Sequence, residues 1–421
     1  MIKLLSLFSG IGAFESALRR CGRPYEVVNY CEIDPHASRS YSQIHGVPET
    51  KNLRDVCAID TAKISGVNLI TYGFPCQDIS VSGKQHGFEH NGERTRSGLF
   101  YEALRIIQDL QPEYAIAENV KALVSKKFTA EFKAVLDGLE AAGYNNYWQV
   151  LNAKNYGIPQ QRERVFIISI RKDCDAGLFS FPAPQELKLR VKDMLEPEVD
   201  DKYYLTGEGA QRLIQAYAAR INEAITEPVI CASRGRNPAD LRDRAAGAYT
   251  EQHLEPKNDG TSNTITTVQK DNLLLEPKIK IIGSTNGHQS GNVMHHNTDL
   301  CPCLTVAGHV EPLKILQIGN LIPDAGRKFT NPQTGRVYDP QGLSPTINTA
   351  QGGQREVKII ETTPEAYRIR KLTPRECYRL MGFTDAEFDS IKGVSNTQLY
   401  KQAGNSIVVN VLEAIFRQLP I

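Results

Sequence analysis

Cys76, in the segment Gly73-Phe74-Pro75-Cys76-Gln77, is the first candidate for chemistry in this chain of 421 residues. It follows the apolar run 69–72, so we expect it beyond the carboxyl end of a strand, where open α/β sheets build sites. A thiolate there could attack an electrophilic carbon. A lone cysteine is more often a small buried hydrophobe. The local Pro-Cys-Gln and the polar loop 78–97, which predicts a mobile lid, favour a nucleophile.

Glu118 and two arginines could handle protons and charge beside such a nucleophile. Glu118 ends the apolar run 114–117, where desolvation would disfavour its charged form and let it donate a proton. Arg162 and Arg164 open another predicted strand and could clamp a carboxylate, a phosphate or a carbonyl oxygen. The ordinary alternatives are an acid at a helix N-terminus and a solvated charged turn.

The segment Phe8-Ser9-Gly10-Ile11-Gly12 connects a predicted strand to a predicted helix and can bring backbone N–H groups close to a ligand. Glu15 stands where a dinucleotide site has its third glycine, so a nucleoside without a pyrophosphate fits better. Glu32 follows the second predicted strand and could accept hydrogen bonds from ribose hydroxyls. Together these features indicate an adenosyl cofactor. A turn glycine and a surface glutamate are the alternative.

The elements that must position these residues alternate over 1–185 between short apolar runs and amphipathic segments. This pattern is typical of βαβ units on a largely parallel sheet. The predicted strands are 3–8, 26–31, 69–72, 114–117, 147–151 and 164–170, and the predicted helices are 14–20, 99–110 and 129–142. The last segment, 407–419, has helical periodicity and is expected to pack on the same domain.

A second domain is expected over 186–394, with the first domain, 1–185, completed by 395–421. Its sequence mixes Gly, Asn, Thr and Pro with short β-like runs. Between 226 and 360 a strand-loop-strand unit recurs about three times, with Thr264, Cys303 and Thr346 at equivalent places. A loop-bearing β surface of this kind suits the reading of a partner.

Composition sets the protein class. With 41% hydrophobic and 23% charged residues the chain is neither disordered nor collagen-like, and no window reaches the roughly 18 apolar residues of a membrane span. The net charge of +1 neither requires nor excludes a nucleic-acid partner. Nine cysteines form no dense, even framework, which favours a cytoplasmic location.

Taken in order, these segments resemble the motif set of the DNA (cytosine-5)-methyltransferases over 1–170 and 368–421. The matching segments are 8–12 (FSGIG), 73–77 (GFPCQ), 118–120 (ENV), 161–164 (QRER), 370–377 (RKLTPREC), 380–383 (LMGF) and 402–406 (QAGNS). The compact length resembles the bacterial and phage enzymes of restriction-modification systems. The resemblance implies an α/β fold: a Rossmann-like S-adenosylmethionine-dependent methyltransferase domain with a smaller, mostly β target-recognition domain.

The resemblance also implies a mechanism. Cys76 would add to C6 of a flipped-out cytosine in duplex DNA, Glu118 would hold or protonate N3, and Arg164, with Arg162, would bind O2 and the nearby backbone. S-adenosylmethionine would become S-adenosylhomocysteine, and no metal is needed. The residues that match the family's cofactor pocket are Phe8, Gly10, Ile11, Gly12, Glu32, Ile33, Asn52, Leu53, Pro75, Leu99, Asn405 and Ile407. Those expected at the DNA are Gln77, Ser80, Ser82, Lys84, Gln333, Arg336 and Thr346.

Two positions depart from the family pattern: Ile33 replaces an aromatic residue, and Asn52 stands where an acid usually faces the adenine amino group. A zinc site at Cys301 and Cys303 would have non-standard spacing. Adenine methylation would need an Asp/Asn-Pro-Pro-aromatic tetrad, which is absent. A tRNA-methylating relative would have a shorter recognition region, and an inactive DNA-binding relative would lack Cys76 or Glu118. We expect a bacterial or phage-encoded monomer, compatible with a separate cognate restriction endonuclease.

Overall fold

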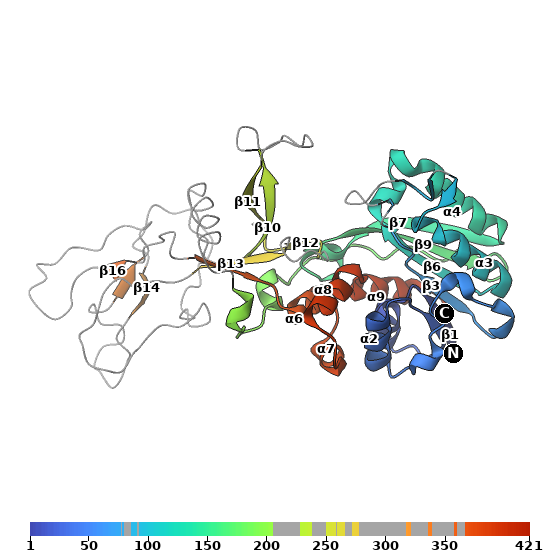
Figure 1. The fold of residues 1–421 in the computed structure, drawn as a ribbon, viewed down its shortest axis with the longest axis horizontal. Coiled ribbons are helices and arrows are strands. Elements are labelled where there is room, and N and C mark those ends of the chain that lie inside the picture. Colours follow the sequence, from blue (N-terminus) through green and yellow to red (C-terminus); the bar gives the residue numbers. More distant parts are fainter. Residues whose placement is uncertain are drawn as a thin grey trace, which may run out of the picture. The chain divides into compact units, whose positions relative to one another are not determined.

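The computed structural model divides the chain into two compact units (Figure 1). It describes residues 1–76, 78–79, 86–90, 92–204, 228–237, 250–257, 259–265, 272–277, 317–320, 336–338, 358–359 and 367–421. Unit 1 comprises 1–199, 256–272 and 372–421, and unit 2 comprises 200–255 and 273–371.

Unit 1 is built on a six-stranded sheet in the order β2-β1-β3-β6-β9-β7. Its strands are β1 (Ile2–Leu7), β2 (Tyr25–Cys31), β3 (Leu69–Tyr72), β6 (Tyr114–Val120), β7 (Tyr144–Asn152) and β9 (Glu163–Arg171). The first four in this order run parallel, whereas β9 is antiparallel to both β6 and β7. All six predicted strands are confirmed, and the sheet is mixed at the β9-β7 edge.

The helices of unit 1 come from both ends of the chain. They are α1 (Ala13–Arg20), α2 (Pro35–His45), α3 (Phe100–Leu110), α4 (Thr129–Ala141), α6 (Pro374–Leu380), α7 (Asp385–Ser390), α8 (Asn396–Asn405) and α9 (Val409–Gln418). The three helices predicted near the N-terminus are confirmed. Helix α2 was not predicted, because its sequence has few apolar residues, although Asp34 caps its first turn and Pro35 begins it.

Helices cover both faces of this sheet (Figure 1). On one face Leu5 and Leu7 of β1 join a buried cluster with Phe100 and Ile106 of α3 and residues of α4. On the other face α1 meets α9, where the rings of Phe14 and Phe416 are 6.4 Å apart. Fully burying one such large apolar side chain contributes about 1.5–3 kcal/mol. The predicted C-terminal helix therefore packs on the first domain as expected.

The boundaries of unit 1 differ from the expected division at 185 and 395. Segments 256–272 and 372–394 belong to unit 1, partly because Gln160 ties them together. Its amide donates to the Leu380 carbonyl at 2.7 Å and accepts from the Ile265 N–H at 3.1 Å. Nearby, β12 (Ser262–Asn263) pairs in parallel with β8 (Gln160–Gln161).

The described part of unit 2 contains two small sheets. One has the order β11-β10-β13-β17, formed by β10 (Val229–Arg236), β11 (Glu251–Pro256), β13 (Leu273–Pro277) and β17 (Tyr367–Lys371). The other is β14 (Gln317–Asn320), β15 (Arg336–Tyr338) and β16 (Lys358–Ile359). In the first sheet Arg370 is 1% exposed and its Nε lies 2.9 Å from Oε1 of Glu276. The predicted repeats lie mostly outside the described residues.

A short hairpin, β4 (Glu89–His90) and β5 (Glu93–Arg94), lies within the predicted lid. Helices in the described ranges are too short or too polar to cross a bilayer.

Candidate active site

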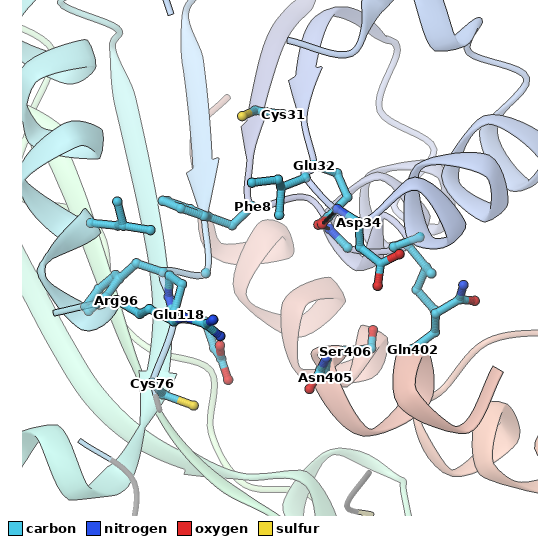
Figure 2. A pocket seen from close by; sticks show the side chains of 18 of the residues that line it. Phe8, Cys31, Glu32, Asp34, Cys76, Arg96, Glu118, Gln402, Asn405 and Ser406 are labelled. Carbon is cyan, nitrogen blue, oxygen red and sulfur yellow. Dashed lines mark hydrogen bonds between the residues drawn. The ribbon is translucent and has the colours of Figure 1, made fainter. Parts of the chain in front are cut away.

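A cavity of about 560 Å³ lies at the carboxyl ends of β1, β2, β3 and β6 in unit 1 (Figure 2). Its size is typical of small-molecule sites, which run from about 300 to 1,000 Å³. Figure 2 shows Cys76 and Glu118 on one side of this space, with Glu32 and Asp34 on another. All four predicted catalytic residues, namely Cys76, Glu118, Arg162 and Arg164, line it.

Cys76 lies four residues beyond the end of β3, in a half-buried position at the cavity wall. Asn119 of β6 supports this segment because its amide donates to the Phe74 carbonyl at 3.0 Å. Burial raises the pKa of the Cys76 thiol and so does the charge of Glu118, while Arg164 and Arg162 lower it. In the free protein the thiol is therefore protonated near neutral pH.

Glu118 is buried in β6, and its carboxylate meets Arg164 of β9. The antiparallel register puts Val120 opposite Arg164, so Glu118 and Arg164 are diagonal neighbours on one face. Arg164 Nε lies 3.0 Å from Glu118 Oε1. Burial raises the pKa of Glu118, although Arg164 and Arg162 oppose that shift. Burial thus favours the protonated acid, and the guanidinium partner favours the carboxylate and orients it.

Arg162 is 4% exposed, and backbone carbonyls occupy its guanidinium. It donates to the carbonyls of Ile265 at 3.1 Å, Gly404 at 3.3 Å and Ser406 at 2.6 Å. Burial lowers the pKa of Arg162. These contacts join three segments of unit 1 at the cavity wall. Both arginines line the cavity, where Arg164 contacts the acid and Arg162 contacts the backbone.

The turn after β1 and the acid after β2 meet at one end of the cavity. Gly10 has a φ of +56°, which glycine adopts without strain, and its N–H donates to Glu32 Oε2 at 2.8 Å. The Asp34 N–H donates to Glu32 Oε1 at 2.8 Å. Burial raises the pKa of Glu32. Each carboxylate oxygen keeps acceptor capacity, so the two oxygens could accept hydrogen bonds from the two hydroxyls of a ribose.

Asn52, expected at the adenine, does not line the cavity. Its oxygen accepts from the N–H groups of Glu32 at 3.0 Å and Arg54 at 2.8 Å. Its amide donates to the Glu32 carbonyl and to Ser38 Oγ, both at 2.9 Å. Because all four of its hydrogen-bonding positions are used, Asn52 supports Glu32 from behind. Two acids that sequence reasoning missed, Asp34 and Asp55, do line the cavity.

Asp55 precedes a short 3₁₀ turn, Val56–Ala58, and its Oδ1 accepts from the Cys57 N–H at 3.0 Å. An aspartate at the start of such a turn was the available signal.

Eight of the twelve expected cofactor residues line the cavity: Phe8, Gly10, Ile11, Glu32, Ile33, Pro75, Leu99 and Asn405. Leu53, Gly12 and Ile407 do not: Leu53 packs against the hydrophobic core, Gly12 caps α1 and Ile407 is buried.

Residues of α8 and the following turn complete the wall. Lys401, Gln402, Gly404 and Ser406 join Asn405 there. Lys401 Nζ lies 2.7 Å from Asp34 Oδ2, so an ion pair connects α8 to the start of α2 at the cavity. Sequence analysis placed only Asn405 of this group.

Several expected DNA-contacting residues lie outside the described residues: Gln77, Ser80, Ser82, Lys84, Gln333 and Thr346. Arg336 begins β15 in unit 2. Among the residues that the structure describes, no cluster of His, Cys, Asp and Glu could hold a metal ion, and Cys301 and Cys303 lie outside that part.

Comparisons with known proteins agree with this geometry. The family model for C-5 cytosine-specific DNA methylase matches residues 2–420. The chain is 33% identical to the orphan methyltransferase M.SPRI of Bacillus phage SPR, over 99% of this chain and 97% of that protein. It is 28% identical to the type II methyltransferase M.HhaI of Haemophilus parahaemolyticus, over 98% of this chain and 93% of that protein.

Solved structures show the same fold at low sequence identity. The Entamoeba histolytica methyltransferase EhMeth superposes with a TM-score of 0.58 at 14% identity, covering 99% of this chain and 97% of that one. The S. pombe Dnmt2 methyltransferase superposes with a TM-score of 0.54 at 20% identity, with the same coverage. The fold is that of S-adenosylmethionine-dependent methyltransferases. From the family match over almost its whole length, we conclude that this chain belongs to the C-5 cytosine-specific DNA methylases, which methylate cytosine in DNA using S-adenosylmethionine.

Proposed function

We propose that the protein is a site-specific DNA (cytosine-5)-methyltransferase that works through a covalent bond between Cys76 and C6 of a flipped-out cytosine. One observation carries the proposal: Cys76, Glu118 and Arg164 line the same cavity as Glu32 and Gly10. A base-reactive group and a nucleoside-binding group therefore share one space.

The bound cofactor, S-adenosylmethionine, supplies an electrophilic methyl group on a sulfonium. In this proposal Glu32 accepts from the ribose hydroxyls, while Asp55 and the exposed side chain of Ile33 flank the adenine. Ile33 is 76% exposed and lines the cavity, so a ligand there would cover apolar surface that now faces water. The sulfonium methyl group needs no metal to activate it.

Cys76 performs the nucleophilic step. Its sulfur would bond to C6, and the C5–C6 π electrons would move so that C5 becomes nucleophilic and can accept a methyl group. The thiol must first lose its proton, and its pKa is raised in the free protein. Binding of the substrate and closure of the surrounding segment would have to favour the thiolate.

Glu118 supplies the acid. A proton held on its carboxyl can pass to N3 as negative charge develops in the ring, and Arg164 fixes the carboxyl through the 3.0 Å contact. Arg164 can also approach the cytosine O2, since it lines the cavity. The C5 proton would then pass to water, its bonding electrons would re-form the C5–C6 double bond, and the Cys76 sulfur would leave C6 as a thiolate. Return of the N3 proton to the Glu118 carboxylate would complete the ring and reset the acid.

The proposed substrate is duplex DNA, from which one cytosine must leave the stack at a cost of a few kcal/mol. We assign Gln77, Ser80, Ser82 and Lys84 to contacts beside the flipped base. Gln333, Arg336 and Thr346 are assigned to sequence recognition in the other unit. We further propose that the protein acts as a monomer in the cytoplasm of a bacterium, with any cognate endonuclease acting separately.

Incubation with methyl-labelled S-adenosylmethionine tests the function. Duplex DNA should acquire label at cytosine C5 and tRNA should not, and Cys76→Ala should remove transfer while DNA binding survives. Bisulfite sequencing of DNA from cells that express the protein then gives the recognised site. Label in tRNA alone, or turnover by Cys76→Ala, would contradict the proposal.

A further inference from the structure

The last residue of α2, His45, reaches the turn after β1, at the end of the cavity that Glu32 lines. Its Nε2 lies 3.0 Å from the Ile11 carbonyl oxygen. The peptide group that carries this carbonyl also carries the Gly12 N–H, which donates to the Ser9 carbonyl at 2.9 Å. The turn from Ser9 to Gly12 is therefore closed by its own backbone on one side and held by an imidazole on the other.

Gly12 leaves the space that the imidazole fills. Its φ is +82°, and a Cβ built on it would overlap the ring of His45. Any side chain at residue 12 would therefore be strained and would displace the ring. The glycine and the histidine form a matched pair across the turn.

The hydrogen bond fixes the protonation of the ring. A carbonyl oxygen only accepts, so Nε2 carries a hydrogen, and in the neutral ring Nδ1 then has only a lone pair. Nδ1 is buried and has no hydrogen-bond partner. Burial lowers the pKa of His45 to about 4, so the ring is neutral near pH 7. The Ile11 carbonyl is thus its polar contact.

A buried aromatic stack holds this ring in place. The ring of Tyr41 is 4.8 Å from that of His45 and 4.1 Å from that of Tyr30. Tyr30 lies in β2, two residues before Glu32, and the Tyr41 hydroxyl donates to Glu15 Oε1 of α1 at 2.7 Å. The stack thereby connects the strand that presents the ribose acid to the glycine turn.

We propose that His45 is a positioning residue for the adenosyl cofactor, acting through its hydrogen bond to Ile11. Ile11 and Gly10 both line the cavity, and Gly10 orients Glu32. Fixing the peptide between residues 11 and 12 keeps this whole turn in the conformation that meets the ligand. The proposal rests on the proposed function, since it takes the cavity to be the cofactor site.

A matched pair of amide variants separates the hydrogen bond from simple packing. His45→Gln can place an amide N–H near the position of Nε2, whereas His45→Asn is one methylene too short to reach the Ile11 oxygen. His45→Leu keeps bulk and removes the donor altogether. Binding of S-adenosylhomocysteine to each full-length protein is measured by titration calorimetry, with the melting temperature measured in parallel.

We expect His45→Asn and His45→Leu to weaken binding about tenfold, which corresponds to about 1.4 kcal/mol, the scale of one hydrogen bond. His45→Gln should stay within about threefold of wild type. The KM for the cofactor should rise in the same order, while kcat at saturation and the KM for DNA stay unchanged. A residue that only stabilises the fold would shift the melting temperature in all three variants without this order.

Each outcome has a distinct meaning. If wild-type protein binds no S-adenosylhomocysteine, the proposed function fails before the variants are considered. If wild type binds and both His45→Asn and His45→Leu bind equally well, the positioning role is overturned. It is also overturned if His45→Gln loses as much affinity as His45→Asn, or if neither His45→Asn nor His45→Leu folds.

Discussion

Arg164 Nε lies 3.0 Å from Glu118 Oε1, and the two residues are diagonal neighbours on the antiparallel strands β6 and β9. The pair forms where the parallel part of the sheet gives way to its antiparallel edge. Arg164 opposes the rise in the pKa of Glu118 that burial causes. The arginine therefore both aims the acid and tunes how readily it gives up its proton.

This pair should act as a unit in turnover. Glu118→Gln should lower kcat by about 10²- to 10⁴-fold, the usual range for a positioned acid. Arg164→Gln should lower kcat by a similar factor because the carboxyl is no longer held. The double variant should lose much less than the product of the two single losses. Single-turnover rates at saturating DNA and cofactor measure this, and fully additive losses would show that the residues act separately.

The pH dependence of Cys76 alkylation should report the charges around it. Burial and Glu118 raise the pKa of Cys76, so in wild type the midpoint should lie above the roughly 8.5 of a free thiol. Glu118→Gln removes a negative charge and should move the midpoint down. Arg164→Gln removes a positive charge and should move it up. Iodoacetamide labelling of the Cys76 peptide, quantified by mass spectrometry without substrate, gives the midpoints. Shifts of the same sign in both variants would refute the assignment.

Substitutions at Asp55 and Asn52 should distinguish a residue that contacts the ligand from one that supports Glu32. Asp55→Asn keeps an oxygen for the turn but removes the charge at the cavity, so affinity for S-adenosylhomocysteine should fall about 3- to 10-fold with an unchanged melting temperature. Asn52→Asp loses both donors behind Glu32 and should destabilise the protein by about 1–3 kcal/mol. Calorimetry and thermal melts of the two variants test this, and the opposite pattern would restore Asn52 as the ligand contact.

The buried ion pair of unit 2 should matter for stability and not for cofactor binding. Arg370→Met leaves the carboxylate of Glu276 buried without its guanidinium, which should cost about 3–5 kcal/mol. Adding Glu276→Leu should recover most of that loss. The chain has one tryptophan, Trp148, in β7 of unit 1, so its fluorescence follows unit 1 while circular dichroism follows both units during urea unfolding. If the fluorescence transition of unit 1 shifted as much as the dichroism transition, the ion pair would not act on unit 2 alone.

Sequence reasoning found Cys76, Glu118 and Glu32 for one physical reason. Each follows or ends an apolar run that forms a strand of the sheet, and the carboxyl ends of such strands meet at one edge. The six strands were predictable because apolar runs of this length have few other uses in an alternating pattern.

Asp55, Lys401 and His45 were not predictable in the same way. Asp55 and Lys401 reach the cavity through a loop and a helix from opposite ends of the chain, and their approach depends on how these segments pack. His45 ends a helix with few apolar residues, and its role depends on the space left by Gly12. Nor does the sequence show that the Arg162 guanidinium donates hydrogen bonds to backbone carbonyls.

The central claim is that Cys76 becomes bonded to C6 of a cytosine. Once the recognised site is known, duplex DNA with 5-fluorocytosine at the target position is incubated with the protein and S-adenosylmethionine. Because fluorine cannot leave as a proton does, the account predicts a stable protein–DNA adduct, mapped to the Cys76 peptide by mass spectrometry and missing in Cys76→Ala. No adduct from enzyme that methylates the unmodified duplex, or an adduct at another residue, would contradict it.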